Sequence, residues 1–87
     1  MAAYRVDLHA GAERDLERLA PVLLAQVLSR LHALAADPRP PGAEKLAAHE
    51  GYRVRVGDWR IVYEIDDPTR RVLIRRIRHR RDVYRRR

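Results

Sequence analysis

The sequence predicts an α+β domain in which a helical hairpin covers one face of a mostly antiparallel sheet. Three observations support this fold class. Alternating apolar and polar residues lie near the N-terminus, apolar residues at helical spacing follow them, and alternation returns from Gly51 onward. Strands and helices segregated along a chain in this way are typical of α+β folds. At 87 residues the chain has room for one domain, so we expect residues 1–87 to fold as a single unit.

The N-terminal part is expected to form one strand and one short helix. Residues 4–9 alternate between apolar and polar side chains, which is the period of a half-buried strand. The residues of this strand that should face the core are Tyr4, Val6 and Leu8. Gly11 should interrupt the pattern. From Ala12 the apolar residues recur at helical spacing, which leaves Asp15 and the other charged residues of this helix in solvent.

A second, longer helix should begin at Pro21 and end at Asp37-Pro38. Proline suits the first turn of a helix because its missing N–H would have no partner there, and the residue before a proline disfavours helical geometry. The apolar stripe of this helix consists of Leu24, Val27, Leu28, Leu31, Leu34 and Ala35. The short connection between the two helices predicts an antiparallel hairpin.

The second half of the sequence predicts a three-stranded meander. Residues 37–50 are rich in proline and indicate a loop, in which residues 45–48 are compatible with one helical turn. The strands are expected at residues 52–56, 59–65 and 72–77. Gly57-Asp58 is a two-residue hairpin signal, and residues 66–69 form a second turn cluster. The N-terminal strand should join this sheet, since an isolated strand does not stay folded.

Positive charge is concentrated in the meander and the C-terminal tail. The chain has 19 basic and 12 acidic residues, and Lys45 is the only lysine. Residues 1–50 carry six basic and seven acidic residues, whereas residues 51–87 carry thirteen arginines and five acidic residues. A one-sided basic excess suggests a polyanionic partner, and arginine is well suited to bidentate phosphate contacts.

Other classes of function lack their sequence signals. The absence of cysteine excludes a disulfide framework and a thiolate zinc site, and the histidines have no metal-ligand spacing. We see no glycine-rich phosphate loop and no nucleophile elbow. No apolar stretch has the length of a signal peptide or a membrane span. We therefore expect a cytoplasmic protein with no membrane contact and no metal or cofactor.

Strand phase predicts one basic face on the sheet. If Tyr52, Val54 and Val56 face the helices, the opposite face collects Arg53, Arg55, Arg60 and Glu64. The tail could bring an imidazole and a phenol alongside, together with further arginines: Arg78, His79, Arg80 and Tyr84. The sequence thus predicts a basic cleft.

Residues 52–67 and 77–84 together resemble the RelE/ParE superfamily of bacterial and archaeal toxins. The resemblance implies the toxin of a type II toxin–antitoxin system, neutralised by a RelB-like antitoxin that wraps the helical hairpin and is acidic where it meets residues 51–87. RelE-like members cut mRNA in the ribosomal A site. The 2′-OH of the message attacks the adjacent phosphate, and no metal takes part.

The resemblance also implies roles for individual residues. Arg60 would clamp the scissile phosphate, Arg80 would stabilise the transition-state charge, and Tyr84 would stack on or orient the cleaved nucleotide. The remaining basic residues would bind RNA: Arg53, Arg55, Arg78 and Arg81. Two of them, Arg53 and Arg55, stand where some relatives have lysine. Arginine has a pKa above about 12 and does not act as a general base near neutrality.

The base must then be another group. His79 is the best candidate because its ordinary pKa of about 6.5 suits proton transfer, and His49 and Glu50 are weaker ones. Catalysis with no dedicated base remains open. Two other functions also remain open, namely a ParE-like toxin that poisons DNA gyrase and a degenerate homologue that only binds antitoxin or RNA. The intact set of Arg60, Arg80 and Tyr84 favours the nuclease.

Overall fold

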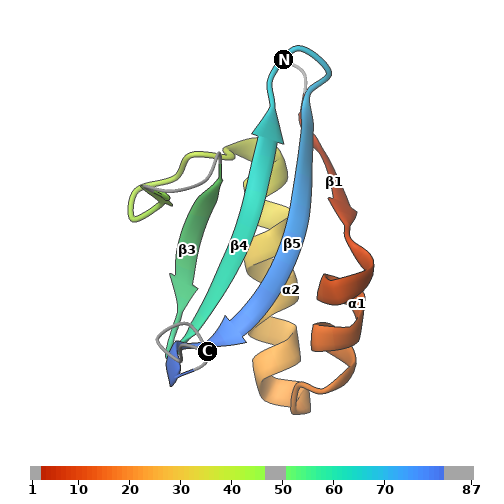
Figure 1. Ribbon diagram of the computed structural model, residues 1–87, viewed down its shortest axis with the longest axis vertical. Coiled ribbons are helices and arrows are strands. Elements are labelled where there is room, and N and C mark those ends of the chain that lie inside the picture. Colours follow the sequence, from red (N-terminus) through yellow and green to blue (C-terminus); the bar gives the residue numbers. More distant parts are fainter. Residues whose placement is uncertain (1–2, 47–50, 82–87) are drawn as a thin grey trace.

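The computed structural model describes residues 3–46 and 51–81. The two helices and five strands follow one another as β1 (Arg5–Leu8), α1 (Ala10–Glu17), α2 (Pro21–Ala36), β2 (Glu44–Lys45), β3 (Tyr52–Val56), β4 (Trp59–Asp66) and β5 (Arg71–His79) (Figure 1). The strands form one sheet in the order β1-β5-β4-β3-β2. The predicted α+β class and the order of strand, helical hairpin and meander are confirmed.

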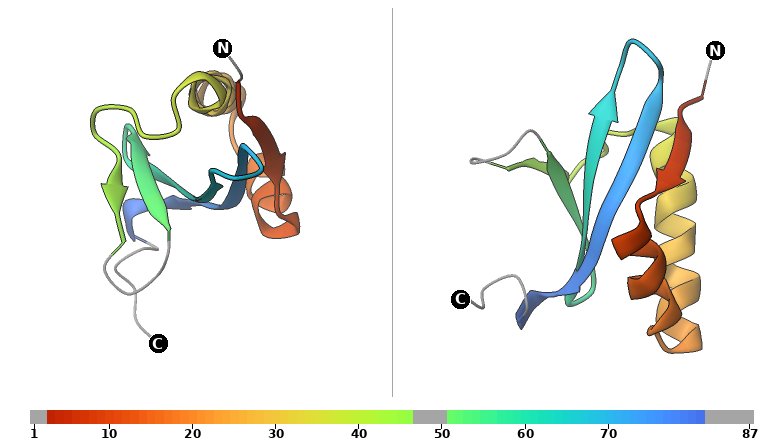
Figure 2. Two further views of the ribbon diagram at one scale, coloured as in Figure 1. Left: turned by 90° about the horizontal axis from the view of Figure 1, so that it is seen from above. Right: turned by 45° about the vertical axis from the view of Figure 1, so that its right-hand side comes forward.

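The N-terminal strand joins the sheet beside the last strand of the meander. β1 runs parallel to β5, and all other neighbouring strands are antiparallel. α2 lies across one face of the sheet, and α1 lies beside the outer edge of β5 (Figure 2). The two helices run in opposite directions, as the short connection between them predicted (Figure 1).

The core lies between α2 and the sheet. Val27, Leu31 and Leu34 contribute from the helix. The strands contribute Val54, Val56, Ile61, Tyr63, Val72, Ile74 and Ile77. Leu28 was expected in the apolar stripe but is 45 % exposed. The buried stripe is narrower than predicted, because it consists of Val27 and the residues four and seven positions after it. Leu28 points about 100° away from Val27 around the helix axis and so leaves the core.

α1 begins at Ala10, two residues before the position that the sequence predicted. The Nδ1 atom of His9 accepts a hydrogen bond from the Gly11 N–H at 3.1 Å and so caps the helix. Gly11 therefore lies inside the first turn and does not interrupt it. Asp15, expected in solvent, is tied to β5 and its side chain is 11 % exposed.

The segment before the meander forms a short strand, so the helical turn predicted at residues 45–48 is wrong for its described part. Glu44 and Lys45 form β2, which pairs with the first two residues of β3. The Leu46 N–H donates to the Gly51 carbonyl at 2.8 Å. The Gly57-Asp58 hairpin is confirmed, with Gly57 at a φ of 60° that favours glycine.

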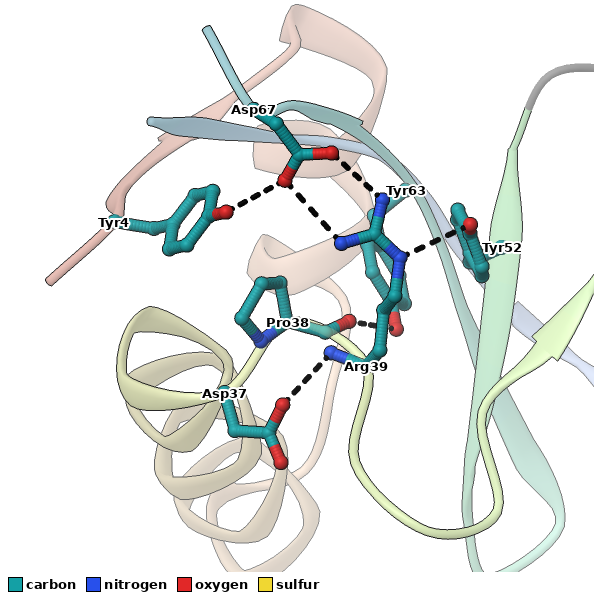
Figure 3. Close-up of polar contacts among 7 residues, drawn as sticks. All are labelled: Tyr4, Asp37, Pro38, Arg39, Tyr52, Tyr63 and Asp67. Atoms are coloured by element: carbon teal, nitrogen blue, oxygen red, sulfur yellow. Dashed lines mark hydrogen bonds and ion pairs between the residues drawn. The ribbon is translucent and has the colours of Figure 1, made fainter. Parts of the chain in front are cut away.

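A polar network fastens the loop after α2 to one end of the sheet (Figure 3). Arg39 forms a bidentate pair with Asp67, at 2.9 and 3.2 Å, and also donates to the Tyr52 hydroxyl at 3.1 Å. Tyr4 donates to the same carboxylate of Asp67. The buried Tyr63 hydroxyl donates to the Pro38 carbonyl at 2.8 Å. The network joins the N-terminus, the loop and the β4–β5 turn.

Neither helix in residues 3–46 and 51–81 is long and apolar enough to cross a membrane.

Candidate functional site

Three arginines lie side by side across the sheet. In the observed register Arg55 of β3 is opposite Arg60 of β4, and Arg60 is opposite Arg78 of β5. We call Arg55, Arg60 and Arg78 the arginine row. Opposite residues on neighbouring strands point to the same face, and the adjacent positions Val54 and Ile61 are buried toward α2. The row therefore lies on the face that the helices leave open.

The members of the row differ in exposure. Arg55 is exposed and Arg78 is partly buried, whereas Arg60 is 6 % exposed and is the one buried charged residue within the described part of the chain. The prediction that Arg55 and Arg60 share one face is confirmed. The prediction that Arg60 lies on an open surface is wrong, because Arg60 is buried in the middle of the row, with an arginine on each side.

A β-bulge puts Arg78 into the row. Val62 pairs with Arg76 and the next residue, Tyr63, pairs with Ile74, which leaves Arg75 as an extra residue in β5. Strict alternation from the buried Ile74 would have turned position 78 toward the helices. The bulge reverses the phase of the rest of β5 and aims Arg78 at the open face.

The same bulge takes His79 away from the row. His79 pairs with Trp59 on the side of the sheet that faces the helices, and the two rings meet edge to face with centroids 5.3 Å apart. Its Nδ1 atom accepts a hydrogen bond from the Arg81 N–H at 3.1 Å. The expected grouping of an imidazole with the arginines is therefore not observed, because β5 continues through His79, whereas the sequence placed this residue in a tail after a strand that ends at residue 77.

Arg53 lies on the open face but is already paired. Its Nε atom donates to Glu44 of β2 at 2.9 Å. This partner was missed because β2 was not predicted. Farther along the same face, Glu64 approaches Arg75 at 3.9 Å. The open face is therefore not uniformly basic, because Glu44 and Glu64 lie beside two of its arginines.

The remaining predicted site residues lie at or beyond the β3–β4 hairpin. The Arg80 N–H donates to the Asp58 carbonyl at 2.8 Å, and its guanidinium is 3.9 Å from the Asp58 carboxylate. A hollow of 320 Å³ is lined by Asp58, His79, Arg80 and Arg81. Tyr84, His49 and Glu50 lie outside the described residues.

The opposite half of the open face carries charges of both signs, since Arg5 and Arg71 share it with acidic residues. Asp7, Leu73 and Glu64 form a second cross-strand row, equivalent in phase to the arginine row. With Asp66 and Arg71 these residues line a hollow of 260 Å³. A polyanion on this face would therefore be attracted more strongly at the end with the arginine row than at the other end. Within residues 3–46 and 51–81, no group of three or more acidic or histidine side chains is arranged to hold a metal ion.

A helical hairpin on a five-stranded sheet of this order matches the architecture of solved RelE toxins. An archaeal RelE–RelB complex from Pyrococcus horikoshii OT3 superposes with a TM-score of 0.80 at 25 % identity, over 90 % of this chain and 96 % of that one. The toxin–antitoxin complex RelBE2 from Mycobacterium tuberculosis also has a TM-score of 0.80, at 31 % identity, over 88 % of this chain and 98 % of that one.

Sequence similarity then defines the family. Residues 6–84 match the family described as ParE toxin of type II toxin–antitoxin system, parDE. Toxin RelG from Mycobacterium tuberculosis is 36 % identical over 85 residues, which cover 95 % of this chain and 98 % of RelG. The chain therefore belongs to the RelE/ParE toxin superfamily, the toxins of type II toxin–antitoxin systems.

Proposed function

We propose that this toxin is an endoribonuclease that cuts mRNA on the ribosome and so stops translation. The arginine row carries the proposal. It brings three guanidinium groups side by side on the open face. Guanidinium groups form strong bidentate contacts with phosphate, and a phosphate of single-stranded RNA is an anion that such a row can bind.

The proposed reaction is attack of a ribose 2′-OH on the adjacent phosphorus. The bond from the 2′ oxygen to phosphorus forms, the bond to the 5′ oxygen breaks, and the products are a 2′,3′-cyclic phosphate and a 5′-OH. The 2′ proton is lost and the 5′ oxygen gains a proton. Extra negative charge develops on the phosphate oxygens, and fixed cations that are already in place stabilise it.

Arg60 is suited to this role by its position. A guanidinium held in the middle of the row keeps a fixed direction, whereas a mobile surface arginine does not, and its charge is permanent. Because Arg60 is 6 % exposed, RNA would reach Arg55 and Arg78 first, and contact with Arg60 requires neighbouring side chains to move aside. Arg80 and Arg81 would add phosphate contacts at the hairpin end, Arg53 a weaker one, and Tyr84 would stack on the cleaved nucleotide.

We propose that no residue of the arginine row acts as the general base that accepts the 2′ proton. The three histidines in the described residues, His9, His32 and His79, all lie outside it, and arginine does not lose its proton near neutrality. Catalysis would then rest on the orientation of the message and on positive charge. A role for His79 as the base would require its ring to leave Trp59 and reach the other face.

The proposed partners are the ribosome with its mRNA, in the cytoplasm, and a cognate antitoxin of the RelB type. Both solved relatives named above were determined as toxin–antitoxin complexes. An antitoxin that neutralises this chain would place acidic residues against the arginine row, because buried arginines at an interface need opposite charges.

Membership of the family described as ParE toxin supports a second function, the poisoning of DNA gyrase without nuclease chemistry. The two functions are separated by inducing the toxin in cells without antitoxin and then mapping mRNA 5′ ends and DNA breaks. Codon-phased cuts that disappear with Arg60→Ala or Arg80→Ala support the nuclease. Intact messages together with broken DNA would support the gyrase poison and reject the nuclease.

A further inference from the structure

The outer edge of β5 changes partner halfway along the strand. β1 pairs with β5 only from Arg71 to Ile74, and the His9 N–H donates to the Ile74 carbonyl at 2.8 Å. Beyond this point no described strand continues along that edge, and α1 lies beside it instead (Figure 2). The half of β5 that carries Arg78 therefore has a strand on one side and a helix on the other.

Asp15 of α1 supplies a bond that a neighbouring strand would otherwise supply. Its Oδ2 atom accepts from the Ile77 backbone N–H at 2.8 Å and from Arg76 Nε at 2.9 Å, and its Oδ1 atom accepts from a second Arg76 nitrogen at 3.3 Å. Burial raises the pKa of Asp15, but the hydrogen bonds from Arg76 and Ile77 outweigh it and lower the pKa overall. The carboxylate therefore stays ionised.

α1 also approaches the bulge itself. A Cβ atom on Gly11 would lie 3.0 Å from the Cδ of Arg76 and 3.5 Å from the carbonyl oxygen of Arg75. A larger residue at position 11 would therefore push the helix away from the extra residue of β5. A bulge interrupts the regular ladder, and register is poorly specified where the ladder is interrupted. Gly11 and Asp15 together hold the chain directly at and after the bulge.

We propose that Asp15 is a positioning residue that locks the bulged register of β5 and so keeps Arg78 in the arginine row. A shift by one residue in a strand moves every side chain to the other face. Loss of the lock would therefore turn Arg78 toward the helices, bring Ile77 opposite Arg60 and bring His79 to the open face in part of the population. The structural part of this proposal is independent of the proposed nuclease function, and the part about activity rests on it.

The structural part is tested by amide hydrogen exchange on the full chain. Asp15→Ala removes both bonds, Asp15→Asn keeps an acceptor for the Ile77 N–H, and Arg76→Gln removes the ion pair but keeps the carboxylate. Glu17→Ala is the matched control, because Glu17 is exposed on the same helix. We expect the Ile77 amide to exchange at least about tenfold faster in Asp15→Ala, and to stay close to wild type in the other three variants.

Two results would overturn the lock. One is unchanged exchange at Ile77 in Asp15→Ala. The other is an equal loss of protection in Asp15→Asn and Arg76→Gln, which would mean that the ion pair and not the backbone bond holds the strand. The second comparison needs only the milder variants, so it decides the question even if Asp15→Ala fails to fold.

Activity is measured by single-turnover cleavage of ribosome-bound mRNA. We expect Asp15→Ala to lower the rate constant at saturation about tenfold, with little change in the half-saturating concentration, and Asp15→Asn to restore most of the rate. Fast exchange at Ile77 with unchanged cleavage would reject the link to function. If the wild-type chain does not cleave mRNA, the proposed function is wrong. The role of Asp15 in holding β5 is then tested by hydrogen exchange alone.

Discussion

Arg60 and Arg78 occupy directly opposite positions on β4 and β5, and they share a face only because β5 contains an extra residue at Arg75. In a regular strand Ile77 would stand opposite Arg60, and Arg78 would point toward the helices. The bulge thus places an arginine, and not an apolar side chain, beside Arg60 and completes the row of three. Bulges are common beside functional sites, where they re-aim a side chain.

Replacing the central arginine should separate stability from activity. Arg60→Met keeps the volume of the stem and removes the buried charge. We expect the chain still to unfold in one cooperative urea transition, and mRNA cleavage to fall at least about 100-fold. Urea unfolding and single-turnover cleavage measure the two effects. Arg14→Met, on the exposed side of α1, is the control and should alter neither. Full activity in Arg60→Met would remove this residue from the site.

The two flanking arginines should act through phosphate contacts. Each contact with single-stranded RNA adds about 0.7 to the slope of the logarithm of affinity against the logarithm of salt concentration. We expect Arg55→Gln and Arg78→Gln each to reduce that slope by about this amount, as measured by fluorescence anisotropy with a short RNA. Arg53→Gln should reduce it less, because Arg53 is already paired with Glu44. An equal reduction of the slope in all three variants would show that Arg53 binds phosphate as well as the two arginines of the row do, which would contradict this prediction.

Acid should weaken the fold through two carboxylates. The Arg39 hydrogen bonds, followed by that from Tyr4, lower the pKa of Asp67, and the bonds described above lower that of Asp15. A carboxyl whose pKa is lower in the folded state than in the unfolded state stabilises the fold at any pH above its ordinary pKa of 3.8. This contribution is lost as the pH falls through the pKa of the folded state. The urea concentration at the midpoint of unfolding should therefore decrease when the pH is lowered below about 4. The double variant Asp15→Asn, Asp67→Asn should have a lower midpoint at neutral pH and a flatter pH profile; an unchanged profile would exclude both groups.

The buried Tyr63 hydroxyl should matter for stability and not for cleavage. Tyr63→Phe leaves the Pro38 carbonyl without its donor, and we expect a cost of about 1–2 kcal/mol in urea unfolding. Burial also raises the pKa of Tyr63 to about 12. The difference between the phenolate absorbance titrations of wild type and Tyr63→Phe should therefore show a transition near that pH. A transition near 10 would indicate that the hydroxyl is accessible to water.

The sequence by itself determined the features that depend on local geometry. The limits of α2 follow from Pro21 and from Asp37-Pro38, and the hairpin follows from Gly57. The common face of Arg55 and Arg60 follows from the period of two along strands joined by a tight turn. Each of these features is specified by residues within a few positions of one another, so pattern and propensity were sufficient.

The tertiary structure decided where distant segments meet. The ionic partner of Arg53 belongs to a two-residue strand that forms only by pairing with β3. The direction of Arg78 depends on a bulge in β5, and Asp15 of α1 accepts a hydrogen bond from the strand directly after it. A one-residue insertion in a ladder leaves no periodic signal in the sequence, yet it reverses every side chain after it, because the direction of a side chain in a sheet is fixed by register with its neighbours.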